Sequence, residues 1–316
     1  MRKYATLTGC VVTLAGALLA GLPLRAQNSV TADTTRVTVT VTSRDQGVPA
    51  ASLRKEDVIV RVDNSRRPVV DWAGAAEGGV GMDLAILVDD SLDTRLGGQF
   101  KDLHEFLRAL PPTTRVGVAY SSHGSARFRQ ELSADHELAA KALRLPSGAT
   151  NDVSAIYLAL ADMLKNWPAG TNRRAVLLIS DGIDLFRGVS DSEPGQNIDL
   201  QAAIDLAQRN GITVFTLFAS GAAPYRNNFY LVGNGQSGLL RLAAETGGEA
   251  YFQGSQTPIA FRPFLQKAAQ RFDRQYVLTF RAHTGEKTGF ARLQVTTEVP
   301  RVQIAAPARV YVPPNQ

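Results

Sequence analysis

The residues of this chain best suited to chemistry are oxygen-bearing side chains that follow an apolar run. Residues 84–88 are wholly apolar, as expected of a strand covered on both faces. Asp89, Asp90, Ser91 and Asp93 follow this run directly. Hard divalent cations such as Mg²⁺ prefer oxygen ligands, and open α/β sheets bind ligands at the carboxyl ends of their strands. The pattern predicts a metal-bearing edge on an α/β domain.

Two other positions are expected at the same edge. Thr150 lies in a polar loop, and Asp181 follows the second apolar run, 175–179, within a Ser-Asp-Gly sequence. The carboxyl ends of parallel strands meet at one edge, so Asp89 and Asp181 can approach each other there. An all-oxygen set of this kind suits Mg²⁺, Mn²⁺ or Ca²⁺ and does not suit zinc.

These motifs, in this order, resemble the metal-ion-dependent adhesion site of von Willebrand factor type A (VWFA) domains. The resemblance covers roughly residues 80–272, and the flanks look like those of secreted bacterial VWFA-related proteins. It implies a non-enzymatic, adhesion-type module that binds a protein ligand, with a carboxylate of the partner completing the metal shell. Asp89, Ser91, Thr150 and Asp181 match the family's metal-site positions.

Asp93 departs from the family pattern, which has serine at this position. The resemblance implies that neutral hydroxyl ligands keep the cation electrophilic. A further carboxylate at Asp93 would weaken the attraction for an anionic partner. Two alternatives stay open at this point: Asp93 improves metal retention, or it turns outward and leaves the site impaired.

Loops at the same edge are candidates for contact with the partner. Phe186 lies in the segment 183–197, and Tyr225, Phe229 and Tyr230 lie among Gly and Asn residues in the segment 221–236. Aromatic side chains on glycine-rich loops are good contact residues. The alternative is that these side chains pack back onto their own domain.

The hydrophobic pattern predicts how these residues are positioned. From residue 82 onward, strand patterns alternate with helical ones, which is typical of a doubly wound, mostly parallel sheet like that of the Rossmann fold. β-rich segments at 35–72 and 274–312 flank this region, and neither has enough strands to be stable alone. We expect the flanks to pair into a small sandwich-like unit, with the α/β domain of residues 80–272 inserted between them.

The N-terminus has the pattern of a secretory signal peptide. Arg2 and Lys3 precede an apolar stretch, and Ala26 offers a cleavage point, so residues 1–26 are expected to be removed. Removal of three basic residues lowers the formal net charge from +5 to +2, which gives little support for nucleic-acid binding. Cys10 is the chain's one cysteine and lies within this segment, so the mature chain has no disulfide.

The signal predicts export to the periplasm, the cell surface or the extracellular space. An uncleaved membrane anchor is the alternative. An enzyme of the hydrolytic or phosphoryl-transfer type could use the same acidic edge, but the haloacid-dehalogenase motif fails at Ser91, and neither a nucleophile elbow nor a phosphate-binding loop occurs. We therefore expect no enzyme and no small-molecule substrate. A structural module with a degenerate metal site is a third hypothesis.

Overall fold

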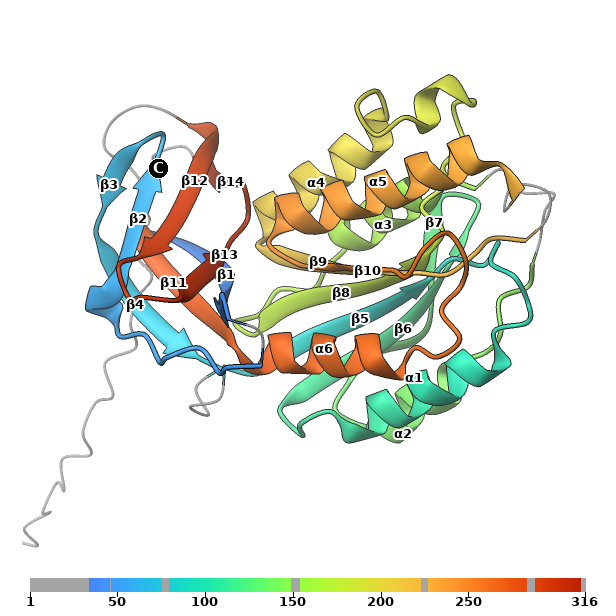
Figure 1. Ribbon diagram of the computed structural model, residues 1–316, viewed down its shortest axis with the longest axis horizontal. Coiled ribbons are helices and arrows are strands. Elements are labelled where there is room, and N and C mark those ends of the chain that lie inside the picture. The colour runs from blue at the N-terminus through green and yellow to red at the C-terminus, as the bar shows by residue number, and fades with distance from the viewer. Residues whose placement is uncertain are drawn as a thin grey trace, which may run out of the picture. The chain divides into compact units, whose positions relative to one another are not determined.

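A six-stranded sheet forms the centre of the α/β domain in the computed structural model (Figure 1), which describes residues 34–45, 47–75, 80–148, 154–222, 227–282 and 288–313. The strand order is β10-β9-β8-β5-β6-β7. All neighbours are parallel except β7, which runs antiparallel to β6. The strands are β5 (Met82–Val88), β6 (Thr114–Ser122), β7 (Ser125–Ser133), β8 (Arg173–Ser180), β9 (Ile212–Phe218) and β10 (Ala250–Tyr251).

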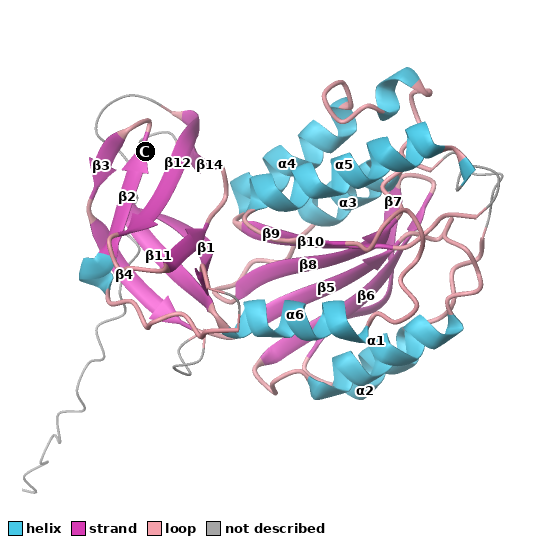
Figure 2. Ribbon diagram, in the orientation of Figure 1, coloured by secondary structure: helices cyan, strands magenta, loops and turns pink. Residues whose placement is uncertain are grey.

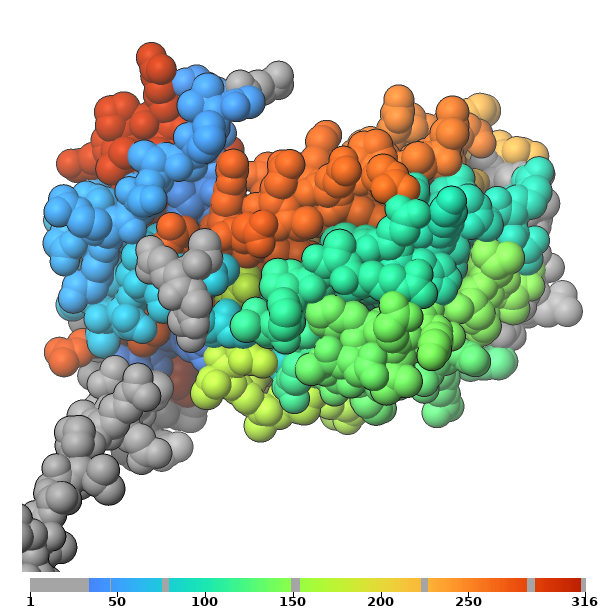
Figure 3. Space-filling view, turned by 90° about the horizontal axis from the view of Figure 1, so that it is seen from below, coloured from blue at the N-terminus to red at the C-terminus, as the bar shows by residue number. Residues whose placement is uncertain are grey.

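Helices cover both faces of this sheet (Figure 2). One face packs against α1 (Gly97–Ala109), α2 (His136–Ala142) and α6 (Arg262–Asp273), and the other packs against α3 (Ile156–Lys165), α4 (Ile198–Asn210) and α5 (Phe229–Thr246). Every residue of β5 and β9 is buried, which explains their unbroken apolar character. Helices α1 and α6 lie side by side (Figure 3), where Arg262 forms ion pairs with Asp102 and Glu105.

Two small antiparallel sheets are built from the flanks of the α/β domain. One has the order β13-β1-β11-β4 and the other β14-β12-β2-β3. Each sheet therefore combines strands from both ends of the described chain, and their facing apolar side chains form a shared core. The elements are β1 (Thr34–Ser43), η1 (Lys55–Asp57), β2 (Val58–Val62), β3 (Ser65–Arg67), β4 (Val69–Gly74), β11 (Gln275–Arg281), β12 (Gly289–Thr297), β13 (Val302–Ala305) and β14 (Arg309–Val312). The predicted fold class is confirmed.

The glycine-rich segment 221–236, expected to be a loop, was predicted wrongly in its second half. Helix α5 begins at Phe229, where the side chain of Asn228 accepts hydrogen bonds from two backbone N–H groups of the first turn. A Cβ on Gly235 would lie 2.2 Å from the carbonyl oxygen of Asp181. Glycine is needed there because the helix packs directly against the loop that carries Asp181.

Residues 1–26, the expected signal peptide, lie outside the described residues. Within the described part of the chain, no helix is both long enough and apolar enough to cross a membrane.

The pairing of the two flanks predicts the effect of truncating the chain after Asp273. β11 and β12 are interior strands of their sheets, so their removal leaves β1 and β2 without the strands that hold them. We expect backbone amides of β1 and β2 to lose protection in hydrogen-exchange mass spectrometry, while those of β5 and β8 keep it. Continued protection of β1 and β2 in the truncated chain would contradict this architecture.

Candidate metal centre

The register of the central sheet brings the ends of β5 and β8 together. Val88 pairs with Ile179, and the backbone N–H of Asp89 donates to the Ile179 carbonyl at 2.9 Å. Asp89 thus directly follows β5 beside Ser180, the last residue of β8, and Asp181 comes next. Both aspartates lie at the carboxyl edge of the sheet, where ligands of open α/β folds bind.

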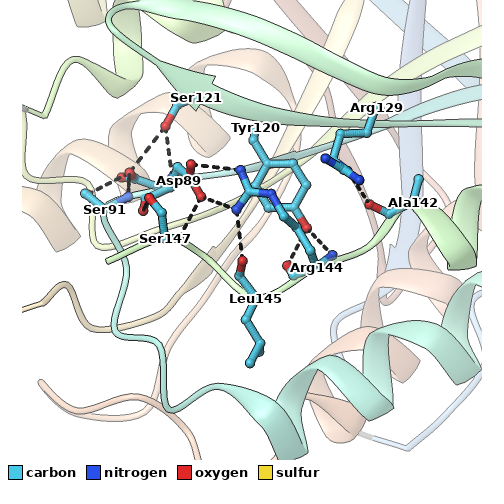
Figure 4. Close-up of polar contacts among 10 residues, drawn as sticks. Asp89, Ser91, Tyr120, Ser121, Arg129, Ala142, Arg144, Leu145 and Ser147 are labelled. Carbon is cyan, nitrogen blue, oxygen red and sulfur yellow. Dashed lines mark hydrogen bonds and ion pairs between the residues drawn. The ribbon is translucent and has the colours of Figure 1, made fainter. Parts of the chain in front are cut away.

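The carboxylate of Asp89 is buried and accepts hydrogen bonds on both oxygens. Figure 4 shows those from Ser91 and Ser121. Its Oδ1 accepts from the backbone N–H of Ser91 at 3.1 Å and from the Ser91 hydroxyl at 2.7 Å, and the Ser121 hydroxyl lies 3.4 Å away. Its Oδ2 accepts from the Ser180 hydroxyl at 2.7 Å. Burial raises the pKa of Asp89, and the hydrogen bonds from Ser180 and Ser91 offset only part of that rise.

Asp181 is also buried, with an exposed fraction of 5%. Its Oδ1 accepts from the backbone N–H of Ile183 at 2.9 Å. A Cβ on Gly221 would lie only 2.1 Å from the other oxygen, so this carboxylate requires glycine there. Burial, followed by the negative charge of Asp89, raises the pKa of Asp181 well above its usual value. The two carboxylates are therefore close enough to repel each other.

Asp184 is a third buried carboxylate, and the sequence analysis missed it. It is 3% exposed and accepts hydrogen bonds from the backbone N–H groups of Tyr157 at 3.3 Å and Phe186 at 3.2 Å. Burial is the main cause that raises the pKa of Asp184 to about 6. Its position three residues after Asp181, in the same loop, was the available signal.

These three aspartates differ from the other buried carboxylates of the domain. Asp83 accepts from Nε and one terminal nitrogen of Arg115, and Asp199 accepts in the same way from Arg187. Asp89, Asp181 and Asp184 form no ion pair with any residue that the structure describes. The site therefore holds negative charge that the described residues do not compensate.

A cavity of about 40 Å³ lies beside Asp89. Its lining includes Ser91, Ser121 and Ser154, so hydroxyl oxygens surround the buried carboxylate. The Ser154 hydroxyl is buried and has no hydrogen-bond partner among the described residues, which is an unfavourable state unless another group, a ligand or water satisfies it. A lining rich in hydroxyl and carboxylate oxygens, with His123 as its one imidazole, fits a hard divalent cation. Asp181 is not among the lining residues.

Two acidic residues of the first cluster form ion pairs with arginines. Asp93 accepts from Arg95 on both carboxylate oxygens and lines a different cavity from that of Asp89 and Ser91. Asp90 is bound by both terminal nitrogens of Arg144, at 2.6 and 2.8 Å. The structure therefore does not bring Asp93 together with Asp89, and of the alternatives for Asp93 it has the outward orientation.

Thr150 lies outside the described residues. The described residues on either side of that gap reach the site. Ser147 and Ser154 both line the cavity beside Asp89, and the backbone N–H of Gly148 donates to the Asp90 carbonyl at 3.1 Å. Ser147 and Gly148 are thus fixed to the segment that follows β5.

The aromatic residues expected to contact a partner are exposed where they are described. The exposed fractions are 52% for Phe186, 79% for Phe229 and 57% for Tyr230. Tyr225 lies outside the described residues. Phe186 follows β8, and Phe229 and Tyr230 begin the helix after β9, so all three belong to connections that leave the carboxyl edge. None of the three packs back into the domain core.

Among the residues that the structure describes, no group of three or more His, Cys, Asp or Glu side chains could hold a metal ion. A cation here would need hydroxyl ligands as well as carboxylates. Ser121, Ser154 and Ser180 are residues that sequence reasoning missed. Ser121 and Ser180 stand at the carboxyl ends of β6 and β8, and this position was the signal that could have identified them.

The raised pKa of Asp184 predicts a pH dependence of stability in a metal-free buffer. The unfolded chain loses this proton near pH 4 and the folded chain near pH 6. The free energy of unfolding therefore falls as the pH rises from 4 to 6. The wild-type protein should lose about 3 kcal/mol of stability over this pH range, and Asp184→Asn should not show this loss. Urea unfolding of both proteins at pH 4, 5, 6 and 7 measures it, and parallel stability curves would contradict the assignment.

No protein-family model matches this chain, and no curated protein matches it. Solved structures do. An aerotolerance-related membrane protein from Bacteroides fragilis is 17% identical, with 61% of this chain and 99% of that chain covered and a TM-score of 0.43. The manganese-loaded TRAP protein of Plasmodium vivax is 11% identical, with 82% and 100% covered and a TM-score of 0.41. The VWA domain of SpRpn10 is 12% identical, with 62% and 93% covered and a TM-score of 0.36.

These likenesses are weak, and nothing about function follows from them. The fold itself is defined by its elements: a six-stranded sheet with one antiparallel edge strand, helices on both faces, and the Asp-x-Ser and Ser-Asp-Gly segments at one carboxyl edge. The α/β domain of this chain has a VWFA-like fold.

Proposed function

We propose that this chain is an exported, non-enzymatic protein-binding module that holds a divalent cation at the carboxyl edge of its central sheet. The cation is Mg²⁺, Mn²⁺ or Ca²⁺, because the available side chains offer oxygen and no sulfur. The partner is a protein that supplies a carboxylate. Export is proposed from the N-terminal sequence, residues 1–26.

The observation that carries this proposal is the uncompensated negative charge at the site. Removing a carboxylate from water costs several kcal/mol unless a counter-charge or hydrogen bonds replace the lost solvation. Asp89 and Asp181 follow adjacent strands and are both buried, and the charge of Asp89 raises the electrostatic cost of ionising Asp181. A dication bound at this edge supplies the charge that two ionised carboxylates need.

The chain's own residues divide into charged and neutral ligands. Asp89 and Asp181 supply charge, while Ser91 and Thr150 supply neutral oxygen. Asp93 is neutralised by Arg95, so its charge does not add to that of the site. A bound cation supplies electrostatic attraction for a carboxylate of the partner. Phe186, Phe229 and Tyr230 then offer exposed apolar surface next to this edge.

One observation favours a second candidate, a structural module with a degenerate metal site. Both oxygens of Asp89 already accept hydrogen bonds from Ser91 and Ser180 within the protein. In such a module the carboxylate would fix the loop after β5 and would need no ion. The metal response of the protein separates the two candidates.

An enzyme that uses the acidic edge is the remaining alternative, and it would lose metal-dependent phosphatase or esterase turnover in Asp89→Ala.

The proposal predicts that Mg²⁺ stabilises the wild-type protein at pH 7. At a concentration about 100-fold above its dissociation constant, Mg²⁺ should raise the melting temperature by roughly 5–10 °C relative to EDTA. Asp181→Asn should melt higher than wild type in EDTA, because it removes one buried charge, and should lose the response to Mg²⁺. Differential scanning calorimetry in EDTA, Mg²⁺ and Mn²⁺ measures both effects.

Asp102→Asn is the matched control, since Asp102 lies in α1 and pairs with Arg262 away from the site. It should keep the full Mg²⁺ response. A wild-type melting temperature that is the same in EDTA and in saturating Mg²⁺ and Mn²⁺ would favour the degenerate-site candidate and reject the metal-dependent one.

Partner capture should depend on both the metal and the exposed aromatic residues. In pull-downs from envelope and secreted fractions, a specific partner should be retained in Mg²⁺ and released by EDTA. Asp89→Ala and the double substitution Phe229→Ser and Tyr230→Ser should each reduce retention about tenfold or more, because each removes a central contact. Leu138→Ser is the control, since Leu138 is 45% exposed on α2. Equal retention by all variants would reject this surface.

A further inference from the structure

A second charged cavity lies at the opposite edge of the central sheet. It has a volume of about 220 Å³, and four arginines line it: Arg36 of β1, Arg173 and Arg174 at the beginning of β8, and Arg209 near the end of α4. No carboxylate is among the described lining residues. The cavity therefore concentrates positive charge where the amino end of β8 meets the first strand of the flanking sheet.

None of these four arginines forms an ion pair with a described residue. Arg173 is buried and donates to the Phe272 carbonyl at 2.8 Å and to Gln275 Oε1 at 2.7 Å. Arg174 donates to two backbone carbonyls, and Arg209 lies over the ring of Tyr311 at 4.2 Å. All of these partners are neutral.

The arginines repel one another. Burial, and then the positive charge of Arg174, lowers the pKa of Arg36. Burial lowers the pKa of Arg173 to about 10. An anion in this cavity would oppose both effects, because its negative charge would stabilise the charged form of the guanidinium groups.

The nearby acidic groups do not neutralise this cluster. Asp71 acts on Arg36 from two strands away, since Thr279 of β11 stands between them in the sheet. Asp273 acts on Arg173 without forming an ion pair. The carboxyl end of α4, where Arg174 donates to the Asn210 carbonyl, adds about half a negative charge. The four arginines carry more positive charge than these groups can balance, so the cluster keeps a net positive charge of more than one.

We infer that this cavity binds a phosphate-type oxyanion with two negative charges. The planar guanidinium group matches the geometry of phosphate oxygens and binds them through charge-assisted hydrogen bonds. Arg36 makes no hydrogen bond through its side chain to any described residue, so its donors are available to a ligand. The ligand is either a soluble phosphate compound or the phosphate headgroup of a lipid, and these sources share the same chemistry.

The test uses inorganic phosphate and pyrophosphate as probes, with the full chain in EDTA so that the metal centre plays no part. Isothermal titration calorimetry at constant ionic strength should show one saturable site. Arg36→Gln and Arg174→Gln should each weaken binding about tenfold or more, the loss expected for one charge-assisted hydrogen bond. Arg127→Gln, which removes an exposed arginine of β7 outside the cavity, should leave the affinity unchanged.

Vesicles distinguish the two sources of phosphate. Co-sedimentation with phosphatidylglycerol vesicles, but not with phosphatidylcholine vesicles, and its loss in Arg36→Gln would identify a lipid headgroup. Binding of pyrophosphate without vesicle binding would identify a soluble ligand. Absence of binding in both assays, or equal binding by wild type, Arg36→Gln and Arg174→Gln, would overturn the inference. Because EDTA is present throughout, this outcome is independent of the metal proposal.

Discussion

Repulsion between two buried carboxylates is the constraint on which this site depends. Asp89 and Asp181 follow adjacent parallel strands, and both are almost completely removed from water. The surrounding chain limits the cost of this arrangement. Ser91 and Ser180 donate to Asp89, Gly221 leaves room for the Asp181 carboxylate, and helix α5 packs closely behind the same loop. Hydrogen bonds reduce the repulsion, and a cation would balance it.

The fold could be predicted from the sequence because each part of it leaves a periodic signal. Unbroken apolar runs mark strands buried on both faces, as in β5 and β9, and alternating residues mark the half-buried strands of the flanks. The pairing of flanks that lie far apart in the chain followed from the instability of either one alone. The start of α5 could not be predicted, since its glycines resemble a loop. In the folded protein they permit close packing against Tyr157 and the Asp181 loop.

The site was less predictable, because side-chain partners depend on tertiary contacts. The strand-end rule was enough to place Asp89 and Asp181 after adjacent strands at one edge of the sheet. The pairing of Asp93 with Arg95, and of Asp90 with Arg144, follows from rotamers that no spacing rule encodes. Asp184 lies three residues after Asp181 in the same loop, but its burial depends on the tertiary structure. The same limit applies to the arginine cavity, whose members come from β1, β8 and α4 and form no motif along the chain.

The most direct test of the central claim is the anomalous scattering of Mn²⁺ in crystals of the protein grown with that ion. The account predicts an anomalous difference peak beside Asp89, within about 2.5 Å of oxygen ligands that include the Ser91 hydroxyl. It also predicts that Asp181→Asn crystals grown in the same way lack the peak. Wild-type crystals without a peak, in which Asp89 still accepts hydrogen bonds from Ser91 and Ser180, would contradict the account.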